Sequence, residues 1–157
     1  MASRTKEESM FHEPVYTIGH AAKKLGVAVP TLRMYEHAGL IIPHRTPSNR
    51  RLYSRHDIEY LEVILDLIRN QGLNIEAIKR MLALIPCWRI IDCPKETREK
   101  CPAYTDSNVP CWLMHKNPCG KYKEECSSCD VYLSCPKMLR DPKQIVRSWG
   151  ETDKSNN

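Results

Sequence analysis

The stretch from Pro30 to Tyr53 constrains the fold of this chain more than any other part of its sequence. It predicts a short helix from about Ala28 to Ala38, because proline is tolerated in the first turn of a helix and Gly39 can adopt the left-handed conformation that ends one. Residues 44–53 then predict a two-stranded hairpin with Pro, Ser and Asn at its tip and arginines on its arms. A short helix beside an arginine-bearing loop can enter a DNA groove and reach phosphates.

A second short helix is predicted directly before this stretch. Thr17 is a good N-cap for it, and Gly26 closes it. Its apolar stripe consists of Ile18, Ala21, Ala22 and Leu25. The residues from Gly26 to Val29 then form the turn of a helix-turn-helix. Because Ala28 is a poor cap, packing must hold the start of the second helix of the pair.

Two longer amphipathic helices are predicted after the hairpin. Ser54 and Asp57 have the spacing of a capping box at the start of the first, which ends at Gly72, and Asn74 caps the second, which runs to Pro86. The residues expected to point inward are Ile58, Leu61, Ile64, Leu65, Ile68, Ile75, Ile78, Leu82 and Ile85. These helices carry no group suited to catalysis, so we expect them to form the core beneath the helix-turn-helix.

Four ordered motifs lie within residues 15–86. They are Tyr16-Thr17-Ile18-Gly19-x-Ala21-Ala22-x-x-Leu25-Gly26-Val27, Thr31-Leu32-Arg33-x-Tyr35-Glu36-x-x-Gly39-Leu40, Arg45-Thr46-x-Ser48-Asn49-x-Arg51-x-Tyr53-Ser54 and Asp57-Ile58. Together they resemble the MerR family of bacterial winged helix-turn-helix regulators. The stretch Gly72-Leu73-Asn74-Ile75-x-x-Ile78-x-x-Met81-Leu82 is more similar to the heat-shock-repressor (HspR) branch. The family usually continues with a long dimerising helix, but here a cysteine-rich segment follows.

The resemblance assigns DNA-facing roles to individual side chains. Thr31, at the start of the recognition helix, would contact a base or a phosphate, and Arg33 and Tyr35 would hold the DNA backbone. In the hairpin, or wing, arginine suits phosphate because its planar fork pairs with the oxygens. The predicted DNA-contacting residues are Thr31, Arg33, Tyr35, Arg45, Arg50, Arg51 and Tyr53. Two alternatives stay open, namely Tyr35 as a core aromatic and the wing arginines as a solvated charged hairpin.

All eight cysteines lie between Cys87 and Cys135, and none lies in the first 86 residues, so they form a separate module. The gaps between them are five, seven, nine, seven, six, two and five residues. Cys87-Trp88 and Cys111-Trp112 repeat 24 positions apart, each after a proline. With Cys93-Pro94, Cys101-Pro102-Ala103-Tyr104, Cys119-Gly120 and Cys126-x-x-Cys129-x-Val131-Tyr132, the segment resembles the two-CW cysteine segment appended to various bacterial regulatory and sensory proteins.

The cysteine chemistry has several possible forms. In a reducing compartment such a cluster favours zinc or an iron-sulfur cluster over a disulfide scaffold, and Cys126-x-x-Cys129 has the tight spacing typical of either. Eight thiolates could fill two four-cysteine sites, so the candidate metal ligands are Cys87, Cys93, Cys101, Cys111, Cys119, Cys126, Cys129 and Cys135. Reversible thiol-disulfide switching and inert structural cysteines without a cofactor remain alternatives. Trp88 and Trp112 are expected to pack the apolar shell of the site.

The sequence predicts a mainly α fold in four parts. They are a disordered lead-in (residues 1–14), the winged helix-turn-helix domain (15–86), a small irregular cysteine-rich metal-type module (87–136) and a tail with a short helix (137–157). Six of the eleven prolines adjoin a cysteine, which is expected to prevent helix formation in the module. The tail helix should begin at Asp141-Pro142, with Ile145, Val146 and Trp149 on one face.

The charge and hydropathy patterns indicate which kinds of partner to expect. The formal net charge is +5, and residues 1–86 hold 12 basic and 9 acidic groups, so much of the surplus lies in the predicted DNA-binding part. No apolar run is long enough to cross a bilayer, which predicts a cytoplasmic protein without membrane contact.

Three classes of function follow from these features. The first, which we favour, is a DNA-binding transcriptional regulator, a repressor by its resemblance, whose cysteine module senses metal, an iron-sulfur cluster or redox state. The second is a regulator whose module is a fixed zinc-stapled surface for dimerisation or for a partner. The third, a thiol-redox or electron-transfer enzyme, lacks any known catalytic motif. The expected partners are double-stranded DNA, a second copy of the chain and RNA polymerase at promoters.

Overall fold

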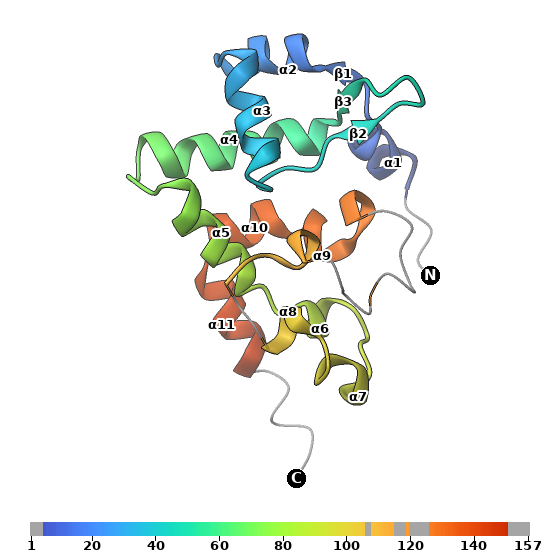
Figure 1. Cartoon of the computed structure of the whole chain (residues 1–157), viewed down its shortest axis with the longest axis vertical. Coiled ribbons are helices and arrows are strands. Elements are labelled where there is room, and N and C mark those ends of the chain that lie inside the picture. Colours follow the sequence, from blue (N-terminus) through green and yellow to red (C-terminus); the bar gives the residue numbers. More distant parts are fainter. Residues whose placement is uncertain (1–4, 106–107, 115–118, 120–125, 151–157) are drawn as a thin grey trace. The chain divides into compact units, whose positions relative to one another are not determined.

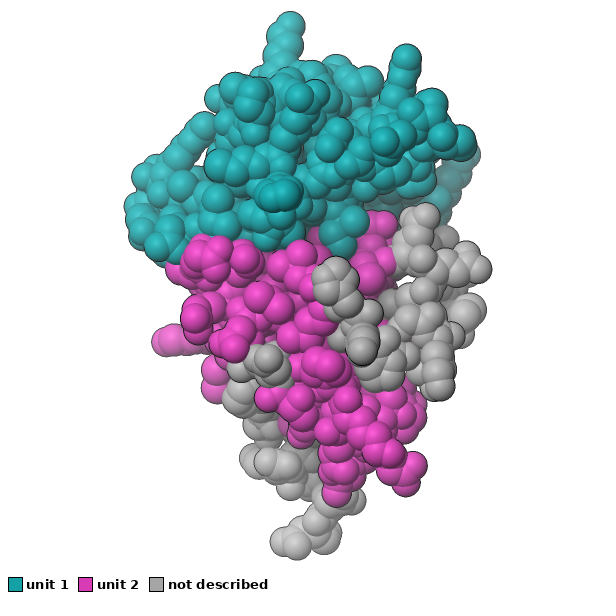
Figure 2. Space-filling model, viewed as in Figure 1, with its two compact units in different colours: residues 1–75 teal, residues 76–157 magenta. Residues whose placement is uncertain are grey.

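The computed structural model describes residues 5–105, 108–114, 119 and 126–150. The chain divides into two compact units, Met1–Ile75 and Glu76–Asn157, coloured separately in Figure 2. The sequence predicts a domain boundary at residue 86. The division between the two compact units lies earlier, at the start of the helix that precedes the cysteines. Each unit is described by itself below.

The first unit begins with a helix that the sequence does not predict. Helix α1, Lys6–His12, starts at a capping box in which the Thr5 backbone N–H donates to Glu8 Oε2 at 2.8 Å and the Glu8 N–H donates to Thr5 Oγ1 at 3.3 Å. It packs against helix α4. Figure 1 shows where α1 lies in the fold. The rings of Phe11 on α1 and His56 on α4 lie edge to face with their centroids 5.8 Å apart. The lead-in that the sequence predicts to be disordered is therefore helical in part. It lacks an apolar stripe, but the capping box and the ring contact stabilise the helix.

The helix-turn-helix has the predicted form. A short strand, β1 (Tyr16–Thr17), leads into α2 (Ile18–Leu25), and α3 (Val29–His37) follows after the turn. The Thr17 hydroxyl accepts the His20 N–H at 3.3 Å, and Gly26 has the left-handed φ of 63° that ends α2. Ala28 makes no capping bond, as expected, so burial of Leu32 and Tyr35 holds α3 in place.

The wing forms the predicted hairpin. Strands β2 (His44–Arg45) and β3 (Arg51–Tyr53) pair antiparallel, with β3 in the centre of a three-stranded sheet of order β1-β3-β2. At the tip, Asn49 adopts a φ of 61°, a conformation that asparagine tolerates better than most residues. The Thr46 hydroxyl accepts the Arg50 N–H at 3.0 Å and closes the loop.

Helix α4, Arg55–Arg69, supplies most of the core of this unit. Ser54 and Asp57 form the predicted capping box, with both side chains buried and Asp57 Oδ2 accepting the Ser54 N–H at 2.8 Å. The buried apolar residues of α4 are Ile58, Tyr60, Leu61, Val63, Ile64, Leu65 and Leu67. Ile68 is only half-buried, which differs from the predicted stripe.

Tyr53 is fully buried, and its hydroxyl has no hydrogen-bond partner among the described residues. Desolvation, followed by the charge of Glu36, raises the pKa of this phenol to about 12. The unfolded phenol ionises near pH 10, so this group stabilises the fold below that pH, and the contribution is lost as pH rises towards 12.

Replacing Tyr53 by phenylalanine should therefore have little effect near pH 8, since no hydrogen bond is lost (about 1 kcal/mol or less). At about pH 11 the wild type should lose roughly 1.4 kcal/mol relative to Tyr53→Phe, because only the wild type gains by ionising on unfolding. Urea unfolding of both proteins at the two pH values measures this difference. A difference that is the same at both values would show that the phenol ionises equally in the folded and unfolded states.

The second unit is a series of short helices. Its first helix, α5 (Ile75–Ala83), buries Ile78 and Leu82. The cysteine-rich segment then contains α6 (Cys87–Ile90), α7 (Lys95–Arg98), α8 (Pro102–Thr105), the 3-10 turns η1 (Cys111–Leu113) and η3 (Cys126–Ser128), α9 (Asp130–Leu133) and α10 (Cys135–Arg140). Helix α11 (Lys143–Gly150) ends the described part. No described helix is long and apolar enough to cross a membrane.

Five of the six prolines beside the cysteines begin helical turns, whereas the sequence predicts that these prolines prevent helix formation, and Pro118 lies outside the described residues. Pro86, Pro94 and Pro110 stand immediately before a helical turn, and Pro102 and Pro136 lie in the first turn of one. Proline suits these positions because the first N–H groups of a helix have no internal partner and its fixed φ is already helical. The module is therefore more regular than expected.

The tail helix exists, but its predicted apolar face is not continuous. Helix α11 starts after Asp141-Pro142, as expected, and Arg147 forms an ion pair with Asp141. Ile145 is buried, whereas Val146 is 62% exposed. Neighbouring helical residues point about 100° apart, so these two cannot share one narrow face. The side chain of Trp149 lies outside the described part.

Candidate nucleic-acid interface and cysteine module

A groove in the first unit joins the start of α2 to the wing. It is lined by Thr17, Ile18, Thr46, Ser48, Asn49, Arg50, Arg51 and Leu52. The first turn of a helix presents backbone N–H groups and the positive end of the helix dipole. With wing arginines beside that end, the groove has the chemistry to hold a phosphate group.

Glu36 ties the wing to the recognition helix α3. Arg45 Nη2 lies 2.5 Å from Glu36 Oε1, and Arg51 Nε donates to Glu36 Oε2. Arg45 also donates through Nη1 to Asn49 Oδ1 at 3.1 Å. The Glu36 side chain is 17% exposed, so this paired carboxylate is partly shielded from water. The sequence does not reveal this pairing, because partners nine and fifteen residues apart follow no local spacing rule.

The predicted contact residues fall into three groups. The side chains of Arg33 on α3 and Arg50 on the wing are exposed and make no hydrogen bond or ion pair with any described residue. Arg45 and Arg51 are engaged with Glu36, and Thr31 is half-buried at the start of α3. The remaining two, Tyr35 and Tyr53, are 4% and 0% exposed and belong to the core.

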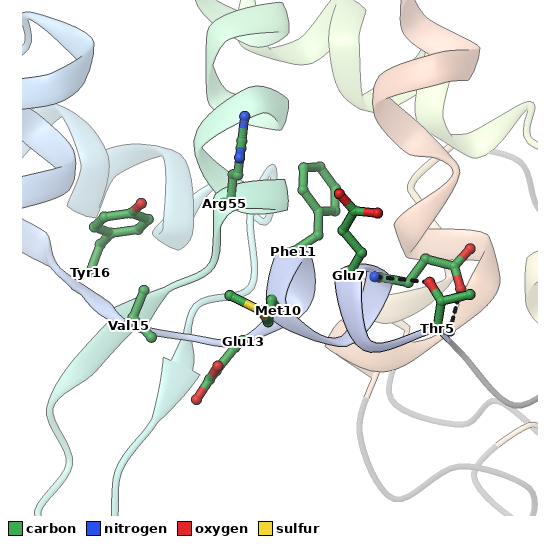
Figure 3. A pocket seen from close by; sticks show the side chains of 9 residues that line it. Thr5, Glu7, Met10, Phe11, Glu13, Val15, Tyr16 and Arg55 are labelled. Carbon is green, nitrogen blue, oxygen red and sulfur yellow. Dashed lines mark hydrogen bonds between the residues drawn. The ribbon is translucent and has the colours of Figure 1, made fainter.

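A second pocket of this unit, beside α1, has the opposite charge (Figure 3). Its lining includes Glu7, Glu8 and Glu13 around the exposed side chain of Met10, and Arg55 is the one basic side chain among the described residues of the lining. Carboxylates repel phosphate, so this pocket does not extend the candidate DNA interface.

In the second unit, the eight cysteines form no disulfide bonds. Cys101, Cys129 and Cys135 are buried, and Cys126 is exposed. Burial and then the neighbouring thiols of Cys119, Cys101 and Cys93 raise the pKa of Cys87 to about 11, although a hydrogen bond from the Trp88 backbone opposes this. The thiols of Cys93, Cys101 and Cys119 thus disfavour a negative charge on Cys87.

The Cys126-x-x-Cys129 pair lies at the start of α9. Cys129 Sγ caps this helix by accepting the Val131 N–H at 3.2 Å, and Cys135 Sγ approaches the Val131 carbonyl oxygen at 3.5 Å. Within the described ranges, no group of three or more His, Cys, Asp and Glu side chains is positioned to hold a metal ion. The donors nevertheless suit zinc or an iron-sulfur cluster, since both prefer thiolate sulfur.

Both tryptophans of the module contact a tyrosine. Trp88 and Tyr104 lie edge to face with ring centroids 4.9 Å apart, and Trp112 and Tyr132 do so at 5.2 Å. Edge-to-face contact is a favoured geometry for aromatic pairs. Trp88 and Trp112 directly follow Cys87 and Cys111 in the sequence. Their role in the apolar shell of a metal site stays a prediction.

Residues 16–85 form a winged helix-turn-helix domain. The helix pair, the three-stranded sheet and the wing define it, and α5 is its last helix. Those residues match the family of MerR HTH regulatory proteins, so the helix-turn-helix part of this chain is similar to that family. The match ends before Cys87. Helix α5, the last helix of the matched region, falls in the second compact unit. That unit therefore contains both the end of the matched region and the cysteine module.

Several curated proteins are similar to this domain. HspR of Streptomyces coelicolor, named as a heat shock protein, is 42% identical over 71 residues, which are 45% of this chain and 47% of that protein. GlnR of Bacillus cereus, named an HTH-type transcriptional regulator, is 38% identical over 71 residues, or 45% and 54% of the two chains. Heavy metal-dependent transcription regulator 2 of Rhizobium meliloti is 41% identical over 73 residues, or 46% and 47%. This chain spans about half the length of these relatives.

The family that matches residues 16–85 is described as regulatory, and GlnR is named a transcriptional regulator. These descriptions give no support to the third class of function, a redox or electron-transfer enzyme.

Proposed function

We propose that this protein is a sequence-specific transcriptional regulator that binds double-stranded DNA through its first unit and is controlled by its cysteine module. The observation that supports DNA binding most is the connection of the wing to α3 by Glu36, which leaves Arg33 and Arg50 exposed on the two elements. Winged helix-turn-helix domains use these same elements to reach a groove and its flanking phosphates.

The proposed contact set is smaller than the sequence predicts. Thr31, Arg33 and Arg50 are available for DNA, whereas Tyr35 and Tyr53 act as core residues. Arg45 and Arg51 act first as positioning residues, because their guanidinium groups hold the wing against Glu36. Their partly exposed edges leave donors for phosphate once the wing is in place.

The proposed control rests on the eight cysteines, which form no disulfide bonds and follow directly after the region that matches the MerR family. Zinc, an iron-sulfur cluster or a change of thiol redox state would each alter this unit, and one relative is named as heavy metal-dependent. A fixed zinc-stapled surface for dimerisation is the second candidate. It is favoured by the short helices after Ile85, since no described helix there could form the long coiled coil of the family. A homodimer that contacts RNA polymerase at promoters completes the proposal.

Arg33→Ala and Arg50→Ala should each weaken binding to specific and random duplex DNA alike. Each change removes about one phosphate contact, so the slope of log affinity against log salt should become less steep by roughly one. Fluorescence anisotropy over a salt series measures both quantities on the full chain.

Arg55→Ala is a suitable control for charge, since Arg55 is an exposed arginine of the same unit that lines the acidic pocket beside α1. It should leave the salt slope unchanged. Equal slopes for the wild type and for both Arg33→Ala and Arg50→Ala would contradict the proposed interface.

A further inference from the structure

Two of the eight cysteines are joined by a tight backbone turn. Cys126 opens the 3-10 turn η3, and the Cys129 N–H donates to the Cys126 carbonyl oxygen at 3.1 Å. A 3-10 turn advances about 6 Å over three residues and places side chains three positions apart on the same side. Disulfides join residues whose Cα atoms lie about 4.4 to 6.8 Å apart. The backbone of this turn therefore suits a disulfide between Cys126 and Cys129.

The thiols of this stretch differ in exposure. Cys126 is exposed, whereas Cys129 is 7% exposed. The next cysteine, Cys135, is 0% exposed, and its Sγ lies 3.5 Å from the Val131 carbonyl oxygen. A dissolved reagent can therefore reach Cys126 first, and the turn brings Cys129 next to it as the second thiol. An exposed cysteine with a second cysteine beside it is typical of thiols that react reversibly.

Cys129 also makes a hydrogen bond that a disulfide would change. Its Sγ accepts the Val131 N–H at 3.2 Å. Val131 follows Cys129 in the chain and Cys126 precedes it, so a sulfur-sulfur bond of about 2.05 Å to Cys126 must draw this sulfur away from Val131. The same short helix, α9, carries Tyr132, whose ring is buried against Trp112. Oxidation of the pair would therefore affect the packed interior of the second unit.

We propose that Cys126 and Cys129 form a reversible dithiol site that reacts with small-molecule disulfides. The reaction needs neither a metal nor the other six cysteines. The proposal deepens the proposed function, on which its regulatory meaning rests, by naming the two thiols and the class of molecule that they sense.

The reaction proceeds by two thiol-disulfide exchanges. The Cys126 thiolate attacks one sulfur of the small disulfide, which forms a mixed disulfide and releases one small thiolate. The Cys129 thiolate then attacks Cys126 Sγ, which forms the disulfide within the chain and releases the second small thiolate. The protein dithiol loses two protons and two electrons, and the small disulfide gains them as two thiols. A dithiol reductant reverses both steps.

Mass spectrometry of the full chain tests this pairing with oxidised glutathione as the probe. The protein is reduced, freed of metal and incubated with the probe, and the remaining thiols are then blocked by alkylation. Trypsin cuts after lysine and arginine, so it releases Cys126, Cys129 and Cys135 in one peptide that ends at Lys137. We expect a disulfide between Cys126 and Cys129, which leaves Cys135 alkylated and lets the peptide fragment between residues 130 and 135.

Two variants should give different products. Cys129→Ser keeps the exposed thiol without its partner, so it should stop at the mixed disulfide of Cys126 with glutathione. Cys126→Ser should form neither product in this peptide, because the remaining two thiols are buried. Serine is a suitable replacement at position 129, since its hydroxyl can accept the Val131 N–H in place of the sulfur.

Three results would overturn the proposal. They are a disulfide to Cys135, a Cys129→Ser protein without the mixed disulfide, and a wild-type pair that stays reduced in excess oxidised glutathione. Far-ultraviolet circular dichroism shows whether each variant keeps its helices, and only folded variants are compared.

DNA binding of the same samples, reduced and oxidised, separates this proposal from the proposed function. Formation of the expected disulfide in a protein that binds no DNA in either state would contradict the proposed function alone. DNA binding by a protein in which this disulfide does not form would contradict the dithiol site alone.

Discussion

Glu36→Ala should lower affinity for the specific DNA site by about ten- to a hundredfold, the largest effect expected for a single change outside the core. The change removes the carboxylate that joins Arg45 and Arg51 to α3 and leaves two like charges beside each other. The wing strands have only two and three residues, so little else fixes the wing against the helix. Affinity for random DNA should hold or rise, because one negative charge is lost.

Glu62→Ala is the matched control. Glu62 is an exposed carboxylate on α4 with no hydrogen bond or ion pair among the described residues, so the variant has the same change in net charge without a change in the wing. Competition binding with specific and random duplexes gives the specificity ratio of each protein. If both variants change this ratio equally, the Glu36 connection has no role in DNA recognition.

Leu32→Ala should destabilise the first unit by about 2 to 5 kcal/mol, a large part of the stability of an ordinary small domain. Leu32 is 0% exposed and is the residue through which α3 enters the core. Loss of its side chain removes apolar contacts and leaves a cavity that the surrounding helices fill only in part.

Met34→Ala, on the same helix, provides the comparison. Met34 is 49% exposed, so its loss should change the free energy of unfolding by no more than about 0.5 kcal/mol. Urea unfolding of the three proteins measures both effects. Similar values for the two variants would show that α3 is not packed on the core as described.

Much of the first unit follows from local signals in the sequence. Thr17 and Ser54 begin helices, Gly26 ends one, and the apolar stripes of α2 and α4 give the buried faces, because caps and periodicity act over a few residues. The wing follows in the same way from its turn residues. The family resemblance, which the match to residues 16–85 confirms, rests on the same positions.

The features that the sequence could not supply depend on distant contacts. Helix α1 has no apolar stripe and is held by Thr5 and by Phe11 against α4. The burial of Tyr53 and the pairing of Glu36 with two arginines require the folded sheet. In the second unit, the high proline content suggests irregular structure. Prolines such as Pro86 and Pro136 nevertheless lie at the starts of helices, where proline is tolerated.

The cysteine grouping shows the same limit. Spacing singles out Cys126-x-x-Cys129, whereas in the structure burial and then the thiols of Cys119, Cys101 and Cys93 raise the pKa of Cys87. Gaps along the sequence report only local geometry, so they do not reveal an interaction of this kind.

The central claim is that the state of the cysteine module sets the affinity of the first unit for its DNA site. The most direct test is the affinity of the full chain for a duplex selected from random DNA, measured with metal bound, with metal removed under reducing conditions, and as Cys93→Ser. Coupling of the usual size predicts that removal and substitution both change this affinity by about five- to a hundredfold in the same direction. Affinity for random duplex should stay constant in all three states, because Arg33 and Arg50 remain exposed. Equal affinity for the selected duplex in all three states would contradict the claim and leave the module a structural staple.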